Sequence, residues 1–192
     1  MKKVIKIIVF ILCIAGFVYF GTLNQNSSKS KKGSKISSND SFFGSAYVFE
    51  SINHSKLLSK LNSSSDSFIV YACFEKNDLC SSYGELINEI AINYEIETIY
   101  YYDFKTDKET SNATYQKIVS KLSDYLITDD LGNQDLYAPS LIFIKNGDLY
   151  AIDDDLVLQH GKKTSSDILT DEKLNEKREV LINIIEGYLT NE

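Results

Sequence analysis

The sequence predicts an α/β domain in which helices cover both faces of a mixed central β-sheet, a three-layer sandwich, preceded by an N-terminal transmembrane helix. Segments with the pattern of strands alternate with amphipathic helices, and strands separated by helices usually pair in parallel. Near the end, Asn146-Gly147 joins two apolar runs, which indicates an antiparallel hairpin because both turn residues accept a positive φ. With 192 residues and 43% hydrophobic composition, the chain can bury one core.

Residues 1–22 are predicted to be a membrane anchor or signal sequence. A basic start precedes an uncharged run of 16 residues, 7–22, which becomes 19 residues, 4–22, if Lys6 snorkels; a span takes about 20 residues. No small-x-small cleavage site ends this run, although Gly21 keeps signal cleavage and secretion as the alternative. We therefore expect a single-pass anchor in the cell membrane, with the following domain on the extracytoplasmic side.

Residues 23–45 are predicted to be a disordered linker, and residues 46–192 to be the folded domain. Serine, asparagine and lysine dominate residues 24–41, where Ile36 is the single aliphatic residue. Such a stretch cannot bury enough apolar surface to fold, so we expect a tether.

The formal net charge of −7 is unevenly distributed. Residues 1–45 hold seven lysines and one acidic residue, whereas the rest of the chain holds 13 basic and 26 acidic residues. Because nucleic-acid binding needs clustered basic residues, the acidic domain argues against a nucleic-acid partner. Arg178 is the only arginine, and together with abundant Lys, Ile and Asn it indicates the AT-rich coding of a bacterium.

The first half of the domain contains two predicted strands and two predicted helices. A short strand is expected at 46–49 and a short helix at 53–61. The nearly continuous apolar run at 68–73 is typical of a strand covered on both faces. The clearest helix is 79–94, because apolar residues recur there at three- and four-residue steps.

The second half continues the alternation and then ends on the hairpin and a last helix. Aromatic and β-branched residues predict a strand at 96–104. Apolar spacing predicts another helix, followed by a polar loop at 129–136, hairpin strands at 141–145 and 148–152, and a final helix at 171–189. The spacing of the middle helix is carried by Tyr115, Ile118, Val119, Leu122 and Tyr125.

The order of elements over residues 46–190, with the single proline just before the hairpin, resembles the thioredoxin superfamily. Phe68-Ile69-Val70-Tyr71 looks like the strand of the thioredoxin-like proteins known as bacteriocin-transport accessory proteins. The resemblance implies a cis peptide bond at Ala138-Pro139 and, beside it, a surface that pairs with an extended peptide. It also implies that Asn77, Ala138 and Pro139 border a substrate-binding surface.

The chain departs from the family at the motif that carries its chemistry. Where the family has Cys-x-x-Cys, this sequence has the degenerate form Asn77-Asp78-Leu79-Cys80. The family's first thiol is the exposed nucleophile, favoured as thiolate by the helix N-terminus, and the second resolves the mixed disulfide. Loss of the first thiol should abolish ordinary dithiol exchange, so the enzyme would be oxidoreductase-like at most.

The remaining thiols leave several interpretations open. Cys13 lies in the apolar leader and is expected to be an inert small hydrophobe, which leaves Cys73 and Cys80 as candidate catalytic residues. Cys80 is either a buried helix cysteine or a reactive thiol. Cys73 could supply its missing partner, as a displaced redox couple or a structural staple, provided that the two Cα atoms lie within about 7 Å. Asn77 has a structural explanation as a helix cap.

No metal or cofactor is predicted. His54 and His160 share no ligand spacing with the cysteines, which makes a zinc site improbable. Asp153-Asp154-Asp155 lacks the spacing of a calcium loop and indicates a solvated acidic turn.

Three functions follow from these observations. The first is a membrane-anchored, extracytoplasmic accessory protein, related to thiol–disulfide exchange on exported peptides or proteins but with reduced or altered redox capacity. The second is a non-catalytic module that binds a peptide or protein of an export assembly beside Pro139. The third is a structural subunit that partners a membrane export component.

Overall fold

The computed structural model describes residues 48–75, 77–128, 132, 134–154 and 171–190. The predicted anchor and linker lie outside the described residues, as do the first two residues of the predicted strand at 46–49. Within the described ranges, no helix combines the length and the apolar character that a membrane crossing needs.

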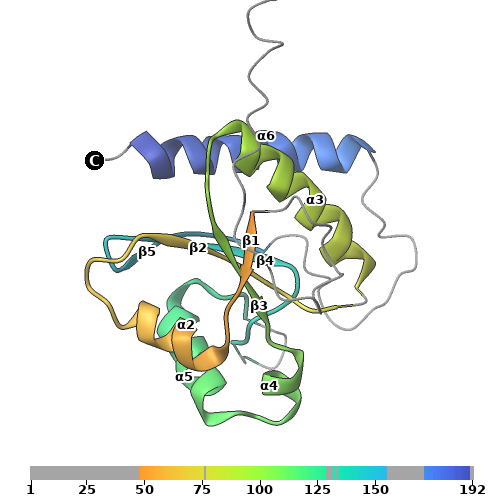
Figure 1. Ribbon diagram of the computed structural model, residues 1–192. Helices are drawn as coiled ribbons and strands as arrows, with labels where there is room; N and C mark the ends of the chain where they lie inside the picture. Colours follow the sequence, from red (N-terminus) through yellow and green to blue (C-terminus); the bar gives the residue numbers. More distant parts are fainter. Residues whose placement is uncertain (1–47, 76, 129–131, 133, 155–170, 191–192) are drawn as a thin grey trace, which may run out of the picture. The chain divides into compact units, whose positions relative to one another are not determined.

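Five strands form one mixed sheet in the order β1-β3-β2-β4-β5 (Figure 1). The first three in this order are parallel, and β4 and β5 add two antiparallel pairings. All six residues of β2, the central strand, are buried, which confirms the predicted strand covered on both faces. The strands are β1 (Phe49–Ser51), β2 (Phe68–Cys73), β3 (Ile99–Asp103), β4 (Ser140–Lys145) and β5 (Asp148–Asp153).

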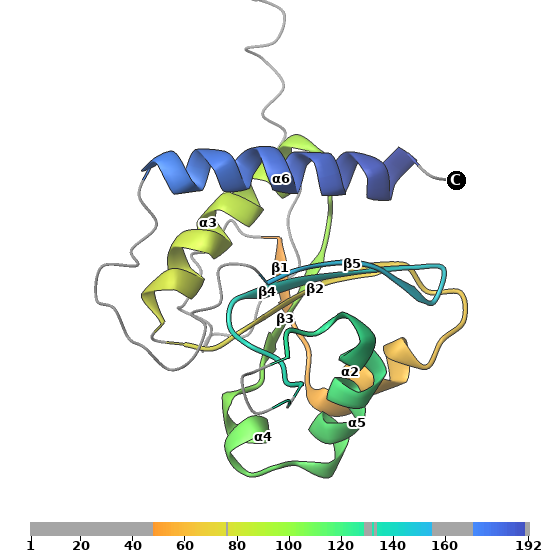
Figure 2. The ribbon, with the colours of Figure 1, turned by 180° about the vertical axis from the view of Figure 1, so that it is seen from behind.

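Helices cover both faces of the sheet, as predicted (Figures 1 and 2). One face carries α3 (Asp78–Asn93) and α6 (Asp171–Thr190), which pack on each other. The other carries α2 (His54–Leu61) and α5 (Ala113–Leu122), with the short α4 (Lys105–Glu109) beside them. The predicted three-layer α/β sandwich is therefore confirmed.

One short helix, α4, was not predicted, and the bounds of two strands and one helix differ from the prediction. The first strand was predicted to end at Phe49, where β1 begins. The predicted strand 96–104 loses its first residues because Ile96 N–H donates to Ala91 O and Glu95 has a positive φ of 55°, so this stretch closes the end of α3. The predicted middle helix ends at Leu122 and continues as a 3-10 turn, Ser123–Tyr125, in which Tyr125, predicted on the apolar face, is 57% exposed. The sequence of α4 is wholly polar, so no apolar period marks it.

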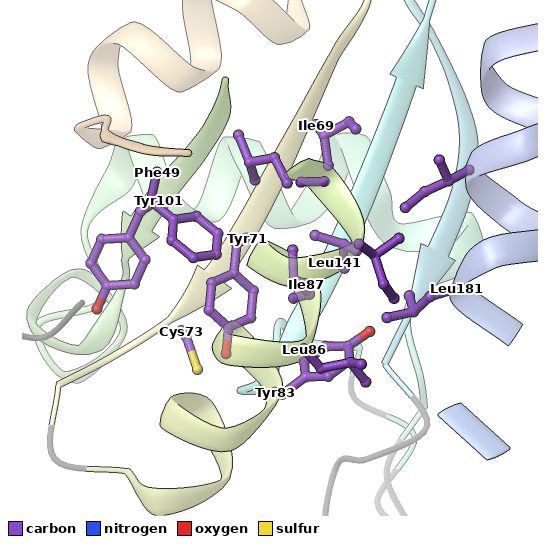
Figure 3. Packing of buried hydrophobic residues seen from close by; sticks show 14 of the residues in the cluster. Phe49, Ile69, Tyr71, Cys73, Tyr83, Leu86, Ile87, Tyr101, Leu141 and Leu181 are labelled. Carbon is purple, nitrogen blue, oxygen red and sulfur yellow. The ribbon is translucent and has the colours of Figure 1, made fainter. Parts of the chain in front are cut away.

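The alternation of side chains along β2 divides the core into two clusters. Ile69, Tyr71 and Cys73 point to the face covered by α3 and α6, where Tyr83, Leu141 and Leu181 join them (Figure 3). The intervening residues of β2 point to the other face and pack with α2 and α5. The edge at which β2 and β3 end therefore has a packed core on both sides.

The Asn146-Gly147 hairpin has the predicted left-handed turn. The φ angles are 53° at Asn146 and 83° at Gly147. Gly147 N–H donates to Asp66 O at 2.8 Å, and a Cβ at Gly147 would lie 2.6 Å from the backbone of Ser63 and Ser64. Glycine is needed here both for its backbone conformation and for the close approach of the turn that precedes β2.

Asp153 corrects the prediction of a solvated acidic turn. Its side chain is only 5% exposed; it forms an ion pair with Lys177 of α6, which is 4% exposed, and accepts a hydrogen bond from the Tyr83 hydroxyl of α3. The pair was missed because Lys177 lies 24 residues away on the far side of a polar segment. Leu189, by contrast, was predicted on the buried face of α6 but is 44% exposed.

We expect Lys177→Met to destabilise the domain by about 3–5 kcal/mol, because it leaves the carboxylate of Asp153 buried without its cation. Arg178→Met is the matched control: the neighbouring residue on α6 also forms an ion pair, with Glu89, but that pair is solvent-exposed and should contribute about 0–1 kcal/mol. Urea unfolding of the two variants measures both losses. Equal losses would contradict the role given to the buried pair.

Candidate functional site

The structure brings the two candidate cysteines together. Cys73 ends β2 and Cys80 is the third residue of α3, and the two form a disulfide with a Cα–Cα distance of 6.1 Å. This separation satisfies the limit of about 7 Å for a bridge. The structure therefore contains the disulfide that the sequence left open as one of several interpretations.

Both cysteines belong to the core cluster on the α3 face of the sheet, where Figure 3 shows the side chain of Cys73. Both cysteines are 0% exposed. The Tyr71 hydroxyl donates to Cys80 O at 2.6 Å, and the Tyr71 ring meets Tyr83 edge-on. Burial, and secondarily the nearby Tyr101, raises the pKa of Tyr71 well above its ordinary value, so this hydroxyl remains a donor. No reagent in solution touches either sulfur while this packing holds.

Asn77 acts as the helix cap that the sequence predicted. Its Oδ1 atom accepts a hydrogen bond from Cys80 N–H at 3.0 Å, and its carbonyl oxygen accepts from Ser81 N–H at 3.1 Å. These bonds satisfy backbone donors of the first turn of α3. The Asn77 amide therefore has a structural role in this chain.

The peptide bond between Ala138 and Pro139 is cis, as the resemblance implied. Pro139 itself is buried, and Ser140 Oγ donates to Tyr137 O at 2.6 Å across this turn. Of the predicted binding residues, Asn77 and Ala138 line a pocket, whereas the buried Pro139 is not among its lining residues.

This pocket, of about 380 Å³, opens at the carboxyl ends of β2 and β3. Its surface is mainly apolar and aromatic, with a few charged side chains. The lining residues are Phe74, Asn77, Leu79, Phe104, Lys105, Lys108, Glu109, Tyr137 and Ala138. Phe74 and Phe104 are in edge-to-face contact, with centroids 5.7 Å apart.

Lys108 fastens α4 to the segment that precedes the cis-proline. Its Nζ atom donates to Leu136 O at 2.8 Å, lies 3.0 Å from Asp135 Oδ2 and stands 4.4 Å from the centroid of the Tyr137 ring. These contacts hold the Tyr137 side of the pocket against α4. Lys108 therefore forms part of the pocket wall, and its ammonium group is already bound by other residues of the domain.

Asp107 fastens the opposite side of α4. Its carboxylate accepts a hydrogen bond from the Tyr102 hydroxyl at 2.8 Å and lies 3.0 Å from His54 Nδ1. Burial, followed by the hydrogen bond to Asp107, raises the pKa of Tyr102 and keeps its hydroxyl a donor. The α4 wall is thus held by polar contacts to α2 and β3 as well as to the proline segment.

Sequence reasoning missed α4, Lys108 and the aromatic residues of the pocket. A signal was present: Phe74 directly follows one predicted strand, Phe104 is the last residue of another, and Tyr137 lies two residues before the only proline. The carboxyl ends of parallel strands meet at one edge of a sheet, so these aromatic side chains were placed to converge. No three His, Cys, Asp or Glu side chains gather closely enough within the described ranges to hold a metal ion.

The pocket lies in acidic surroundings. Glu109 and Lys105 are the exposed charged residues of its lining, and the exposed Glu75, Asp78 and Asp103 are each next in the chain to a lining residue. Because Lys108 is neutralised by Asp135, the described rim carries more negative than positive charge. This agrees in sign with the acidic balance of residues 46–192.

Comparisons with known proteins add the following. No protein-family model and no curated protein sequence matches the chain. Among solved structures, it is similar to oxidised thioredoxin O2 from Arabidopsis thaliana, with 16% identity, a TM-score of 0.43, and coverage of 71% of this chain and 94% of that one. It is also similar to thioredoxin from Trypanosoma brucei brucei, with 12% identity, a TM-score of 0.40, and coverage of 75% and 98%.

A third similar structure is oxidised thioredoxin O1 from Arabidopsis thaliana, with 15% identity, a TM-score of 0.37, and coverage of 65% and 96%. The strand order, the two helix layers and the cis-proline before β4 are those that the resemblance to the thioredoxin superfamily led us to expect.

Alkylation should count the thiols of the full chain. Unfolded without a reductant, the chain is expected to take up a single carbamidomethyl group from iodoacetamide, at Cys13, because Cys73 and Cys80 are bonded to each other. Unfolded with dithiothreitol, it should take up three. Mass spectrometry reads both values, and three groups without reductant would contradict the disulfide.

Proposed function

We propose that this chain is a thioredoxin-like binding protein whose disulfide is structural, and that it holds an extended segment of an exported peptide or protein at the pocket beside Ala138. The observation that carries the proposal is the combination of two features at one edge of the sheet. Asn77 caps α3 where an exchanging thiol would stand, and both cysteines are fully buried.

Thiol–disulfide exchange begins when a thiolate attacks a disulfide sulfur, so the attacking and the attacked sulfur must both be accessible. Cys73 and Cys80 offer no accessible sulfur, and Asn77 supplies none. The buried disulfide and the Asn77 cap stabilise the fold around the pocket, and a binding module requires a stable pocket and no reactive sulfur.

The pocket has the size and lining of a recognition site. Its volume of about 380 Å³ falls in the range of about 300–1,000 Å³ typical of ligand pockets. Phe74, Leu79 and Tyr137 offer apolar surface for one side chain of a bound segment. An extended segment is proposed because the resemblance to the thioredoxin superfamily implies that a peptide pairs beside Pro139, and Ala138 lines the pocket.

Charge favours a cationic segment over an acidic one. Residues 46–192 hold 13 more acidic than basic residues, and acidic side chains predominate among the described residues around the pocket. Opposite charge raises the association rate and disfavours partners of like charge. The proposed ligand is therefore a lysine- or arginine-rich extended segment with one large aliphatic or aromatic side chain.

A second candidate is thiol–disulfide exchange of altered form, in which Cys73 replaces the missing first cysteine. It is favoured by the position of the disulfide at the N-terminal turn of α3. Burial of both sulfurs disfavours it. Insulin reduction by dithiothreitol at a rate raised by the chain would favour this candidate over the binding module.

We also propose that residues 4–22 anchor the protein in the cell membrane, with the domain on the extracytoplasmic side. The basic start and apolar run support the anchor. The disulfide supports the compartment, because such bonds persist in oxidising surroundings. An accessory role beside a peptide-export component, as in bacteriocin transport, is consistent with this location.

The binding proposal is tested with a nine-residue lysine- and serine-rich peptide that contains one leucine, added to the isotopically labelled full chain. The amides of Phe74, Leu79 and Ala138 are expected to shift in the nuclear magnetic resonance spectrum. Leu79→Ser should weaken binding about tenfold, or about 1.4 kcal/mol.

Ile92→Ser is the matched control, since Ile92 is 54% exposed on the same helix but does not line the pocket. It should leave the affinity unchanged. A peptide with serine in place of leucine should bind more weakly to the unaltered chain. Equal effects of Leu79→Ser and Ile92→Ser, or no shifts at these amides, would overturn the proposal.

The location is tested by labelling intact bacterial cells with a membrane-impermeant amine reagent. Exposed lysines such as Lys56 and Lys117 should be labelled in intact cells, and the protein should sediment with membranes. Labelling that requires cell lysis would contradict the extracytoplasmic location, and a fully released protein would favour signal cleavage.

A further inference from the structure

We propose that the Cys73–Cys80 disulfide controls the pocket: the oxidised chain binds its peptide, and reduction by a small dithiol weakens that binding. This inference rests on the proposed binding function and adds a means of regulating it. It assigns the disulfide a role in the affinity of a neighbouring site, in place of a role in exchange with a substrate.

The disulfide closes the segment that forms one side of the pocket. Residues 74–79 lie between the two cysteines, and three of them, Phe74, Asn77 and Leu79, line the pocket. Their positions depend on the short loop that the bond holds shut. The opposite side, formed by α4 and Tyr137, is fastened by Lys108 and Asp107 without any covalent link.

Reduction requires space that the folded domain lacks. Two bonded sulfurs lie about 2 Å apart, whereas two non-bonded thiol sulfurs must separate to about 3.5 Å or more. Both cysteines are 0% exposed and belong to the same cluster as Tyr71 and Tyr83. Because protein interiors are close-packed, the added separation has to displace part of the surrounding backbone.

When the bond opens, the backbone that moves is that of the segment lining the pocket, and not that of β2. Cys73 belongs to β2, where it pairs with Asp103 of β3, and β2 is held between two neighbouring strands. Cys80 lies in the first turn of α3, which is capped by Asn77 from within the closed segment. The cap, Phe74 and Leu79 therefore shift together when the bond opens.

A dithiol such as dithiothreitol reduces the bond in two exchange steps. One thiolate of the reductant attacks a sulfur of the pair, forms a mixed disulfide and releases the other protein sulfur, which takes up a proton. The second thiol of the reductant then closes its own disulfide and releases the remaining protein thiol. Two electrons and two protons pass to Cys73 and Cys80.

Peptide binding and the disulfide must influence each other to the same extent. If the oxidised chain binds more tightly by some factor, bound peptide favours the oxidised state by that same factor. Because both sulfurs are buried, the reductant reaches them only after residues 74–79 have opened. A peptide seated on Phe74 and Leu79 should therefore also slow the reduction.

The test uses the full chain carrying Cys13→Ser, so that only the buried pair changes its redox state, and the leucine-containing cationic peptide described above. Binding is measured before and after complete reduction by dithiothreitol, with mass spectrometry confirming both thiols and circular dichroism confirming the fold. We expect reduction to weaken binding at least tenfold. Equal affinity of the two states would overturn the inference while leaving the binding function intact.

The double variant Cys73→Ala/Cys80→Ala provides a second arm. It should bind like the reduced chain and should not respond to dithiothreitol. If this variant does not fold, the rate of reduction of the unaltered pair decides: the peptide should slow it at least tenfold, and an unchanged rate would overturn the inference. Absence of binding to the oxidised chain would instead refute the proposed function itself.

Discussion

The bond between Cys73 and Cys80 joins the central strand of the sheet to the helix that covers it, and the structure of the site depends on this link. Between the two cysteines, Asn77 caps the first turn of α3, and Phe74 and Leu79 line the pocket. The same link removes both sulfurs from solvent.

The two sides of the pocket are built by different physical means. One side is held by a covalent bond within the core. The other is held by Lys108 and Asp107, whose partly exposed ion pairs each contribute little to stability but fix the direction in which α4 lies. Because Tyr137 packs against Lys108, the position of the proline segment depends on the charged contacts of α4.

The sequence was informative wherever the determining contacts are local. The apolar run of β2, the stripe of α3, the cap at Asn77 and the turn at Asn146-Gly147 were all predicted, since each depends on residues close together in the chain. The disulfide between the two cysteines could be suggested from the sequence but not established, because it depends on how the end of the strand and the start of the helix are oriented.

Contacts between distant segments could not be predicted at all. The pairing of Asp153 with Lys177 and the contact of Lys108 with Leu136 and Tyr137 join polar residues that look solvated in sequence. The pocket followed from these contacts and from aromatic side chains whose convergence depends on the strand order. The candidate site was therefore predicted in its position but not in its shape or lining.

The ion pair between Lys177 and Asp153 also determines when the domain can finish folding. Lys177 lies in α6, the last helix of the described chain, so a growing polypeptide reaches Asp153 well before it contains the cation that neutralises it. Burying that carboxylate alone would cost several kcal/mol, which keeps the incomplete chain from closing over it. The core around Asp153 can therefore close only after α6 has docked on the sheet.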